Sequence, residues 1–570
     1  MSRIKCLDLL KSIAILGVVL FHSGFIKNGY LGVEIFFVVS GYLFVHSVKK
    51  DFDPGDFNPI MFLTKKLSAF LPIVAIAGGG AILLGSFIML PDDLENLSES
   101  IIASNVFANN ILQAITTRNY WNVVNTYKPL MHTWYIAVIM QSFCFLALVL
   151  WLASKKISLK TILIVVTILS FLLYLAPFFS NSDKFYMFPF RLFEITIGGL
   201  VAYIPKRVKM SIDSKRLIGN LGILTIMFLL FANFNIINSI GLLFSILASV
   251  VIIWSHVDIK ENYGMSEKIS SIIVLPGIYS LDIYIWHQIV IAFLLYAVFT
   301  DANVYFLILV LCCTSLLSYF SVWLRKNISL FSGIKKRLAF SIVIAMLSSV
   351  VALCIYFHAG VVRDIPELDI DMNNVHRHMH AEYVDGPYLW NHDFKEENKI
   401  HILVIGDSFA RDFANVINES TYHDDVEISY IDGADLAKYM KRIDDADYVF
   451  YSANSWEVPD SLSVIPNSKL YIVGRKLFGK SNGIFFANRD EDTYFEQRFT
   501  LPDDFILHNN AFKGRYGKHY VDMISPLLDG NNIRIFTDDG FFISQDCLHL
   551  TKNGAKYYSR VIDWDGIVSQ

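Results

Sequence analysis

A serine, an aspartate and a histidine that could form a hydrolase-like site lie in the carboxyl-terminal part of the chain. Residues 401–409 read His-Ile-Leu-Val-Ile-Gly-Asp-Ser-Phe, and Asp546 and His549 follow near the end of the 570 residues. A serine that ends a strand and opens a helix presents its hydroxyl and its own amide at a helix amino terminus. Asp546, three residues before His549, can orient the imidazole that takes the proton of Ser408. The pattern predicts nucleophilic acyl chemistry at Ser408.

Two further positions can stabilise an oxyanion beside this serine. They are the backbone amide of Gly433 and the side chain of Asn454, which follows the apolar run 448–451. A lone serine at a helix start is most often an N-cap, so Gly-Asp-Ser alone is a weak signal. The ordered set of Gly-Asp-Ser, Asn and Asp-x-x-His in one hydrophilic block is a much stronger signal.

A small α/β domain is expected to hold these residues. Apolar runs at 402–405, 448–451 and 470–473 alternate with helix-compatible stretches such as 410–419. Strands that alternate with helices are typical of a mostly parallel sheet covered by helices. The sequence therefore predicts a three-layer α/β domain from about residue 399 to the end.

The composition requires a second, membrane-embedded part. Hydrophobic residues make up 54% of the chain and charged residues 18%, which is too apolar for one soluble domain. The net charge of −4 gives no basic field, so nucleic acid is not expected as a partner. Of six cysteines only Cys547 falls in the hydrophilic block, and no disulfide framework is expected.

About eleven apolar runs are long enough to cross a bilayer. They are centred near Ile15, Phe37, Ile76, Phe143, Val166, Ile197, Met227, Leu247, Ile289, Leu311 and Met346. The first has a basic start but no small-residue cleavage site, and a second follows at once. We therefore expect it to be retained as a span.

The loop charges predict the orientation of these spans. With the amino terminus in the cytoplasm, the strongly basic loops all lie on the cytoplasmic side. They include Lys49, Lys50, Lys65, Lys66, Lys155, Lys156, Lys206, Arg207, Lys335 and Lys336. An odd number of spans then exports the carboxyl-terminal domain.

The segment from about residue 360 to 399 is polar and contains three alternating histidines. His376, His378 and His380 precede a Gly386-Pro387 breaker. A linker is the favoured interpretation, because no cysteine or carboxylate partner stands at metal-ligand spacing. No metal site is expected in the chain.

Several ionisable residues lie within or beside the apolar runs, where their desolvation is costly. They are Asp8, His22, Glu34, His132, Arg191, Glu194 and His287. Arg191 and Glu194, spaced i and i+3, can be a structural ion pair. A single histidine inside a span can equally be a hydrogen-bonded packing residue.

The carboxyl-terminal motifs resemble those of the SGNH hydrolase family. The matching segments are Gly406-Asp407-Ser408-Phe409, Asn454 and Asp546-Cys-Leu-His549-Leu550. The resemblance implies Ser408 as nucleophile, His549 as general base and Asp546 as its orienting acid. It places Gly433 and Asn454 in the oxyanion hole.

The membrane part resembles the acyltransferase-3 family. The segments that carry the resemblance are Asp8 to His22, Gly32-Val-Glu34 to Ser40-Gly41, Pro129-Leu-Met-His-Thr-Trp134, Pro189-Phe-Arg191 to Glu194, and Tyr279 to His287. Members of that family O-acylate, most often O-acetylate, cell-envelope carbohydrates, and fusion to an SGNH domain recurs among them. The implied domains are an acyltransferase-3-like membrane domain over 1–335, an extra span and linker over 336–398, and an SGNH-like domain over 399–570.

The resemblance implies roles for residues of the membrane part. His22 is the implied catalytic residue, as a general base or a transient acyl acceptor. The residues implied to line the acyl-transfer pocket are Glu34, Ser40, Arg191, Glu194 and His287. Lys65 and Lys66 are implied to bind the phosphates of cytoplasmic acetyl-CoA, the expected donor, and no tightly bound cofactor is implied.

The same resemblance implies a relay in the bacterial inner membrane. The acyl group would pass from acyl-CoA to Ser408 in the periplasmic or extracellular domain, and then to an envelope glycan such as lipopolysaccharide O-antigen. One alternative is a membrane-anchored carbohydrate esterase. It is supported by the residues at Ile139, Met140 and Ala69, which differ from those usual in the family. A transporter with an accessory domain is another, but no paired repeats with broken helices are evident.

Overall fold

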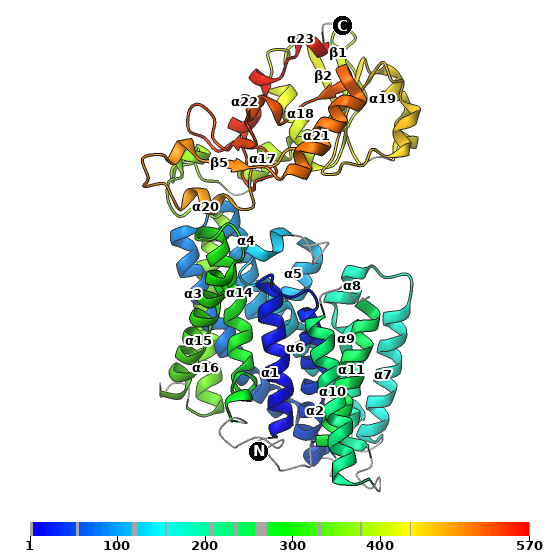
Figure 1. Cartoon of the computed structure of the whole chain (residues 1–570), viewed down its shortest axis with the longest axis vertical. Coiled ribbons are helices and arrows are strands. Elements are labelled where there is room, and N and C mark those ends of the chain that lie inside the picture. The colour runs from blue at the N-terminus through cyan, green and yellow to red at the C-terminus, as the bar shows by residue number, and fades with distance from the viewer. Residues whose placement is uncertain are drawn as a thin grey trace. The chain divides into compact units, whose positions relative to one another are not determined.

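The chain forms two compact units in the computed structural model (Figure 1). The structure describes residues 4–52, 56–116, 123–153, 157–204, 210–232, 238–256, 271–327, 332–376, 379–433 and 435–568. The first unit comprises Met1–Phe87 and Asp93–Cys354, and the second comprises Ile88–Asp92 and Ile355–Gln570. Residues 336–354, which the sequence analysis groups with the linker, thus pack with the first unit.

The first unit is a bundle of α-helices. The helices are α1 (Lys5–His22), α2 (Gly32–Phe52), α3 (Pro59–Ile88), α4 (Pro91–Asn105), α5 (Asn109–Thr116), α6 (Trp134–Ala153), α7 (Leu159–Leu175), α8 (Asn181–Tyr186), α9 (Phe188–Leu200), α10 (Ile212–Phe231), α11 (Asn238–His256), α13 (Leu275–Ile278), α14 (Ser280–Ala297), α15 (Val304–Asn327) and α16 (Ile334–Phe357). Among the described residues, nine helices are long and apolar enough to cross a membrane. A multi-pass membrane unit is therefore confirmed.

The expected count of eleven spans is not reached by length and apolarity alone. The two further expected spans correspond to α1, whose 18 residues include Lys5, Asp8 and Lys11, and to α7, which has 17 residues. Of the basic loop residues that predict the orientation, Lys155, Lys156, Lys206 and Arg207 lie outside the described residues.

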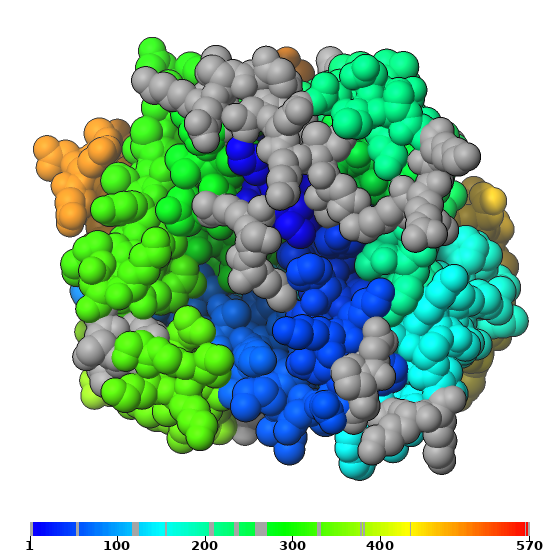
Figure 2. Space-filling view, turned by 90° about the horizontal axis from the view of Figure 1, so that it is seen from below, coloured from blue at the N-terminus to red at the C-terminus, as the bar shows by residue number. Residues whose placement is uncertain are grey.

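Helix α1 lies inside the bundle. It contacts α2, α11, α13 and α14. Most of its apolar side chains are buried, as are the polar Asp8 and Ser12. The end-on view shows the dark blue of α1 between the green of later helices and the blue of α2 and α3 (Figure 2). The helix that ends at His22 is thus enclosed by other helices.

Helices α2 and α9 approach each other closely because glycine faces backbone on both sides. A Cβ atom at Gly41 would lie 1.7 Å from the carbonyl oxygen of Ile195, and one at Gly198 would lie 2.0 Å from that of Val38. Small residues allow this spacing in membrane helices, where packing rather than water drives association. The close crossing brings Glu34 of α2 next to Arg191 of α9.

The second unit contains a parallel five-stranded sheet in the order β2-β1-β3-β4-β6. Its strands are β1 (Ile400–Gly406), β2 (Val426–Asp432), β3 (Tyr448–Ser452), β4 (Leu470–Val473) and β6 (Tyr520–Val521). A second sheet, antiparallel, has the order β5-β8-β7, with β5 (Arg498–Thr500), β7 (Leu528–Asp529) and β8 (Asn532–Arg534). The helices are α17 (Met379–Val384), α18 (Ser408–Asn418), α19 (Met440–Asp445), α20 (Asn482–Phe486), α21 (Asp503–Tyr516), α22 (Lys552–Val561) and α23 (Asp565–Val568).

Both faces of the parallel sheet are buried. Side chains alternate between faces along a strand, so Ile402 and Val404 of β1 enter one apolar cluster while Leu403 and Ile405 enter the other. Helices α18 and α22 contribute to the first cluster, α19 to the second, and α21 to both. The predicted α/β domain and its strands at 402–405, 448–451 and 470–473 are confirmed.

Candidate functional site

Ser408 lies where the order of the parallel strands reverses. Strand β1 pairs with β2 on one side and with β3 on the other, and Ser408 follows β1 as the first residue of α18. The crevice at the carboxyl ends of strands on either side of such a reversal is the usual ligand site of an open α/β sheet. The amide of Ser408 lies in the first turn of its helix, where amides have no acceptor within the helix. The fold thus exposes both the hydroxyl and the amide of this serine.

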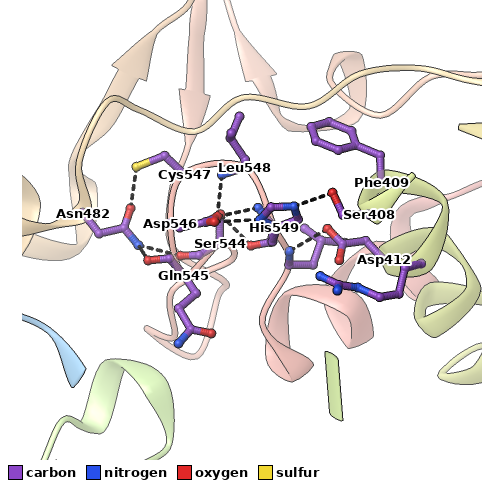
Figure 3. A network of polar contacts seen from close by, with 12 residues as sticks. Ser408, Phe409, Asp412, Asn482, Ser544, Gln545, Asp546, Cys547, Leu548 and His549 are labelled. Atoms are coloured by element: carbon purple, nitrogen blue, oxygen red, sulfur yellow. Dashed lines mark hydrogen bonds and ion pairs between the residues drawn. The ribbon is translucent and has the colours of Figure 1, made fainter. Parts of the chain in front are cut away.

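Ser408, His549 and Asp546 form a connected hydrogen-bonded triad (Figure 3). His549 Nδ1 donates to Asp546 Oδ2 at 2.6 Å, and His549 Nε2 lies 2.7 Å from Ser408 Oγ. Because a carboxylate can only accept, the proton of the neutral imidazole is on Nδ1. Nε2 is then the acceptor for the Ser408 hydroxyl, as a general base requires.

The carboxylate of Asp546 adjusts the basicity of this imidazole. Desolvation by burial opposes a charge on His549, but the hydrogen bond and the negative charge of Asp546 outweigh it and raise the pKa of His549. Burial likewise acts to raise the pKa of Asp546, yet His549 and two backbone amides hold that pKa below its ordinary value. His549 thus becomes a stronger base, while Asp546 stays ionised.

Asp407 ties the oxyanion side of the site to the serine. Its Oδ1 accepts from the amide of Phe409 at 2.9 Å, which caps α18, and its Oδ2 accepts from the amide of Asn454 at 2.8 Å. The side-chain Oδ1 of Asn454 accepts from Arg475 Nη2 at 2.5 Å. Since a guanidinium only donates, the amide NH₂ of Asn454 is the end that can donate to an oxyanion.

Gly433 does not offer the amide that the sequence analysis assigns to it. The N–H of Gly433 donates to the carbonyl oxygen of Gly406 at 2.8 Å, in an isolated bridge between the ends of β1 and β2. Its φ of 92° is a conformation that glycine adopts readily. Donation to an oxyanion would require this bond to break, so Gly433 is a structural turn residue in this state.

The loop that carries Asp546 and His549 is held by a residue that sequence reasoning missed. Asn482 Nδ2 donates to the carbonyl oxygens of Ser544 at 2.6 Å and Gln545 at 2.8 Å. Its Oδ1 accepts from Cys547 Sγ at 2.8 Å (Figure 3). Cys547 has a left-handed φ of 69°. This turn lies between Asp546 and His549, the two triad residues that the loop carries.

Three histidines meet in the first unit: His132 and His287 are buried, and His22 is half-buried. His287 Nδ1 lies 2.6 Å from the carbonyl oxygen of Tyr284, so it carries the proton, and the neutral ring of His287 accepts through Nε2. His22 Nδ1 lies 2.8 Å from that Nε2 and must therefore donate to it. In the neutral state His22 thus has its lone pair on Nε2. His132, which donates from Nε2 to the carbonyl of Ile285 at 3.0 Å, packs edge-on against His287.

The other residues expected around the acyl-transfer pocket form a second buried group. Arg191 Nη2 lies 2.6 Å from Glu34 Oε2 across the α2–α9 crossing, and Arg191 Nε lies 3.1 Å from Glu194 Oε1. Ser40 Oγ lies 3.4 Å from the hydroxyl of Tyr135. The ring of Tyr135 packs against that of Tyr284, next to His287. The rings of Tyr135 and Tyr284 thus connect Ser40 to the histidine group.

The two lysines expected to bind the donor differ in their surroundings. Lys65 is exposed, whereas the ammonium of Lys66 lies over the rings of Phe62 at 5.3 Å and Phe143 at 4.7 Å. Arg337 of α16 reaches the same stretch of α3 and donates to Ser68 Oγ at 3.4 Å. The sequence analysis missed Arg337, because the packing of α16 on α3 is not readable from spacing.

A metal site is not evident in the part of the chain that the structure describes. In those segments no group of three or more His, Cys, Asp or Glu side chains is arranged to hold an ion. His376 Nε2 donates to Glu382 at 2.9 Å. His378 lies outside the described residues, and of His380 only the backbone, in α17, is described.

Comparisons with known proteins bear on the first unit. A family model described as an acyltransferase domain, of the acyltransferase-3 family, matches residues 4–359. The chain is similar to a provisionally named O-acetyltransferase of Staphylococcus aureus (strain COL), with 28% identity over 319 residues and 51% of each chain covered. It is also similar to O-acetyltransferase OatA of Staphylococcus aureus (strain NCTC 8325), with 23% identity over 335 residues and 55% of each chain covered.

A shorter relative is an uncharacterized protein of Haemophilus influenzae, 24% identical over 250 residues, which cover 40% of this chain and 99% of that protein. The chain spans about half the length of the Staphylococcus relatives it matches. No solved structure matches it. Since the family model covers more than half of the residues, including those that form α1 to α16, the chain belongs to the acyltransferase-3 family.

Proposed function

We propose that this protein is a membrane O-acetyltransferase that modifies a cell-envelope polysaccharide. The acetyl group would come from cytoplasmic acetyl-CoA and pass through the membrane unit to Ser408. The observation that carries the proposal is the triad of Ser408, His549 and Asp546, at 2.7 Å and 2.6 Å, in a chain whose other unit belongs to the acyltransferase-3 family. Relatives named as O-acetyltransferases support the choice of acyl group.

In the first half-reaction, Ser408 becomes acetylated. His549 Nε2 takes the hydroxyl proton as Ser408 Oγ forms a bond to the acyl carbon. The negative charge that develops on the acyl oxygen is stabilised by the amide of Ser408 and the NH₂ group of Asn454. The bond from the acyl carbon to the donor group then breaks, and His549 returns its proton to that leaving group.

In the second half-reaction, a glycan hydroxyl attacks the acetyl-serine. His549 takes the hydroxyl proton, a new ester forms on the sugar, and the proton returns to Ser408 Oγ. Water in place of the sugar would give acetate. Exclusion of water by the bound acceptor therefore decides whether the site transfers or hydrolyses.

In the membrane unit, His22 is the residue proposed to act on the acyl group. The hydrogen bond to His287 places the His22 proton on Nδ1 and the lone pair on Nε2, the atom proposed to accept a proton or the acyl group. The Glu34–Arg191–Glu194 group and Ser40 would shape the pocket, and Lys65, with Arg337 near Ser68, would meet the phosphates of the donor. Lys66, turned toward two aromatic rings, is a weaker candidate for that contact.

The proposed setting follows from the spans and from the carboxyl-terminal motifs. The protein would lie in a bacterial inner membrane with its amino terminus in the cytoplasm and an SGNH-like second unit outside. The lipid bilayer, the acyl-CoA donor and an envelope glycan, such as lipopolysaccharide O-antigen, are the proposed partners, and nucleic acid is not among them. The order of Gly406-Asp407-Ser408, Asn454 and Asp546 to His549 in one parallel α/β unit supports the SGNH comparison.

A membrane-anchored esterase is the second candidate. The observation that favours it is that the triad is complete within the second unit, so it can hydrolyse an ester without the membrane unit. The two candidates differ in direction. The transferase adds esters and needs both His22 and Ser408, whereas the esterase removes esters and needs Ser408 alone.

The deciding measurement is base-labile acetate on purified envelope glycan. Cells that lack the protein would receive wild type, His22→Ala or Ser408→Ala, with the amount of each protein in the membrane checked. We expect wild type to add acetate and both variants to add none. Acetate lowered by wild type, in a way that depends on Ser408 but not on His22, would identify an esterase instead.

A further inference from the structure

Two consecutive cationic residues follow strand β4 and contact two sides of the Ser408 site. One side carries Asn454, and the other carries His549. Strand β4 ends at Val473, and Arg475 and Lys476 come two and three residues later. Since β4 is parallel to its neighbour β3, both end at the sheet edge that carries the serine. Arg475 contacts Asn454, whereas Lys476 contacts Asp412 of α18.

Arg475 contacts Asn454, the proposed side-chain donor to the oxyanion. Its Nη2 donates to Asn454 Oδ1 at 2.5 Å, and its guanidinium lies 5.4 Å from the ring centres of both Trp456 and Phe505. A planar guanidinium held against aromatic rings keeps a fixed direction for its hydrogen bonds, which a lysine ammonium does not. With its oxygen held by Arg475, the amide of Asn454 cannot rotate freely, and its NH₂ group keeps one direction.

Lys476 contacts, through Asp412, the segment that carries His549. Its Nζ lies 2.8 Å from Asp412 Oδ2, and both side chains are 2% exposed. The same oxygen accepts from the amide of Leu550, the residue after His549, at 2.9 Å. The Lys476 ammonium also lies 3.8 Å from the ring centre of Phe409, the residue after Ser408. A single buried ion pair thus contacts the neighbours of both the nucleophile and the base.

We propose that Arg475 and Lys476 are positioning residues of the Ser408 centre. Arg475 directs the NH₂ group of Asn454 toward the oxyanion, and Lys476, through Asp412, fixes the segment of His549 against α18. Neither cation touches the reacting atoms; each acts through a neighbour. The inference deepens the proposed function and rests on Ser408 as its nucleophile.

A double-mutant cycle tests the role of Arg475. The full chain, purified in detergent, would hydrolyse p-nitrophenyl acetate, which acetylates Ser408 directly and releases p-nitrophenol. We expect Asn454→Ala to lower kcat about 100-fold, as for loss of one oxyanion donor. Arg475→Met should lower kcat about 10-fold, the order of one hydrogen bond to a charged group. In the Asn454→Ala background, Arg475→Met should change kcat less than about 2-fold.

The same cycle contains the result that would overturn the inference. An equal loss from Arg475→Met in both backgrounds would show that Arg475 does not act through Asn454. Arg515→Met, which removes an exposed arginine stacked on Tyr516, is the matched control and should leave kcat unchanged. A rate in Ser408→Ala equal to that of wild type would refute the proposed nucleophile, which is a different failure.

The role of Lys476 is tested by the pH dependence of the same rate. The groups that influence the charge of His549 are Asp546, Asp412 and Lys476, and Lys476 opposes that charge. Lys476→Met should move the midpoint of kcat/KM to higher pH, and adding Asp412→Asn should move it back. An unmoved midpoint in Lys476→Met, with thermal unfolding showing a folded protein, would contradict this role. If Lys476→Met fails to fold because Asp412 loses its partner, Lys476→Met with Asp412→Asn must keep the wild-type midpoint.

Discussion

Replacing Asp546 by asparagine should lower the catalytic rate strongly by reversing the proton positions on His549. Asp546 Oδ1 accepts from the amides of Leu548 at 3.0 Å and His549 at 2.7 Å, while Oδ2 accepts from His549 Nδ1. In Asp546→Asn the single remaining oxygen is needed by the two amides. The NH₂ group then faces Nδ1, which must become an acceptor, so the proton moves to Nε2. An imidazole with that proton cannot accept from Ser408.

The size of the loss follows from this tautomer. Aspartate-to-asparagine changes with this effect in serine triads lower kcat about 10⁴-fold, which is about 5 kcal/mol of activation free energy. The side chain keeps its volume and its bonds to the loop amides. We therefore expect little change in thermal unfolding. The loss of negative charge also removes the main cause of the raised pKa of His549, so the remaining rate should reach its midpoint at lower pH.

The assay is p-nitrophenyl acetate hydrolysis by the purified full chain, measured across pH and corrected with Ser408→Ala. Asp503→Asn, at the exposed start of α21, is a matched control that should keep the full rate. A rate for Asp546→Asn above about one tenth of wild type would refute the assignment of Asp546 as the orienting acid. So would a midpoint at higher pH than in wild type.

Three further results are expected. Because Asp546 raises the pKa of His549 and the base must be neutral, the wild-type Ser408-dependent rate should rise with pH to a midpoint above about 6.5, and a midpoint below 6 would contradict the geometry. Gly41→Ala would place a Cβ 1.7 Å from a carbonyl oxygen of α9 and should lower both glycan acetate and the unfolding temperature, whereas Gly79→Ala, with no atom within 4 Å, should lower neither. For the membrane unit, His287→Gln can still accept from His22 and should keep at least 10-fold more glycan acetylation than His287→Phe; equal losses would show that the tautomer of His22 does not matter.

Much of the second unit could be predicted from local sequence. The run that ends at Ser408 is apolar and is followed by a helix-compatible stretch, and these are β1 and α18. Asn454 was identified because it follows another strand. By the same rule, Arg475 and Lys476 follow the strand 470–473, and this signal could have identified them. What the sequence lacks is the strand order, which decides that these cations contact the neighbours of Ser408 and His549 rather than solvent.

Other contacts depend on packing that no local pattern encodes. Gly433 lies at the expected sheet edge, but the pairing of β1 with β2 engages its amide with Gly406. In the membrane unit, the cost of burying charge singled out His22 and His287 as unusual. That cost does not indicate that His22 and His287, 265 positions apart, are in contact, because apolar spans carry little information on their neighbours.

The loop from Ser544 to His549 is closed by hydrogen bonds between its own residues. The carbonyl oxygen of His549 accepts from Ser544 Oγ at 2.7 Å and from the Gln545 amide at 3.1 Å. Asp546 Oδ1 accepts from the amide of His549. Asp546 and His549 are therefore held relative to each other by bonds within the loop. The hydrogen bond from Ser408 is the triad contact that leaves this loop, so the placement of the loop against α18 sets the distance between nucleophile and base.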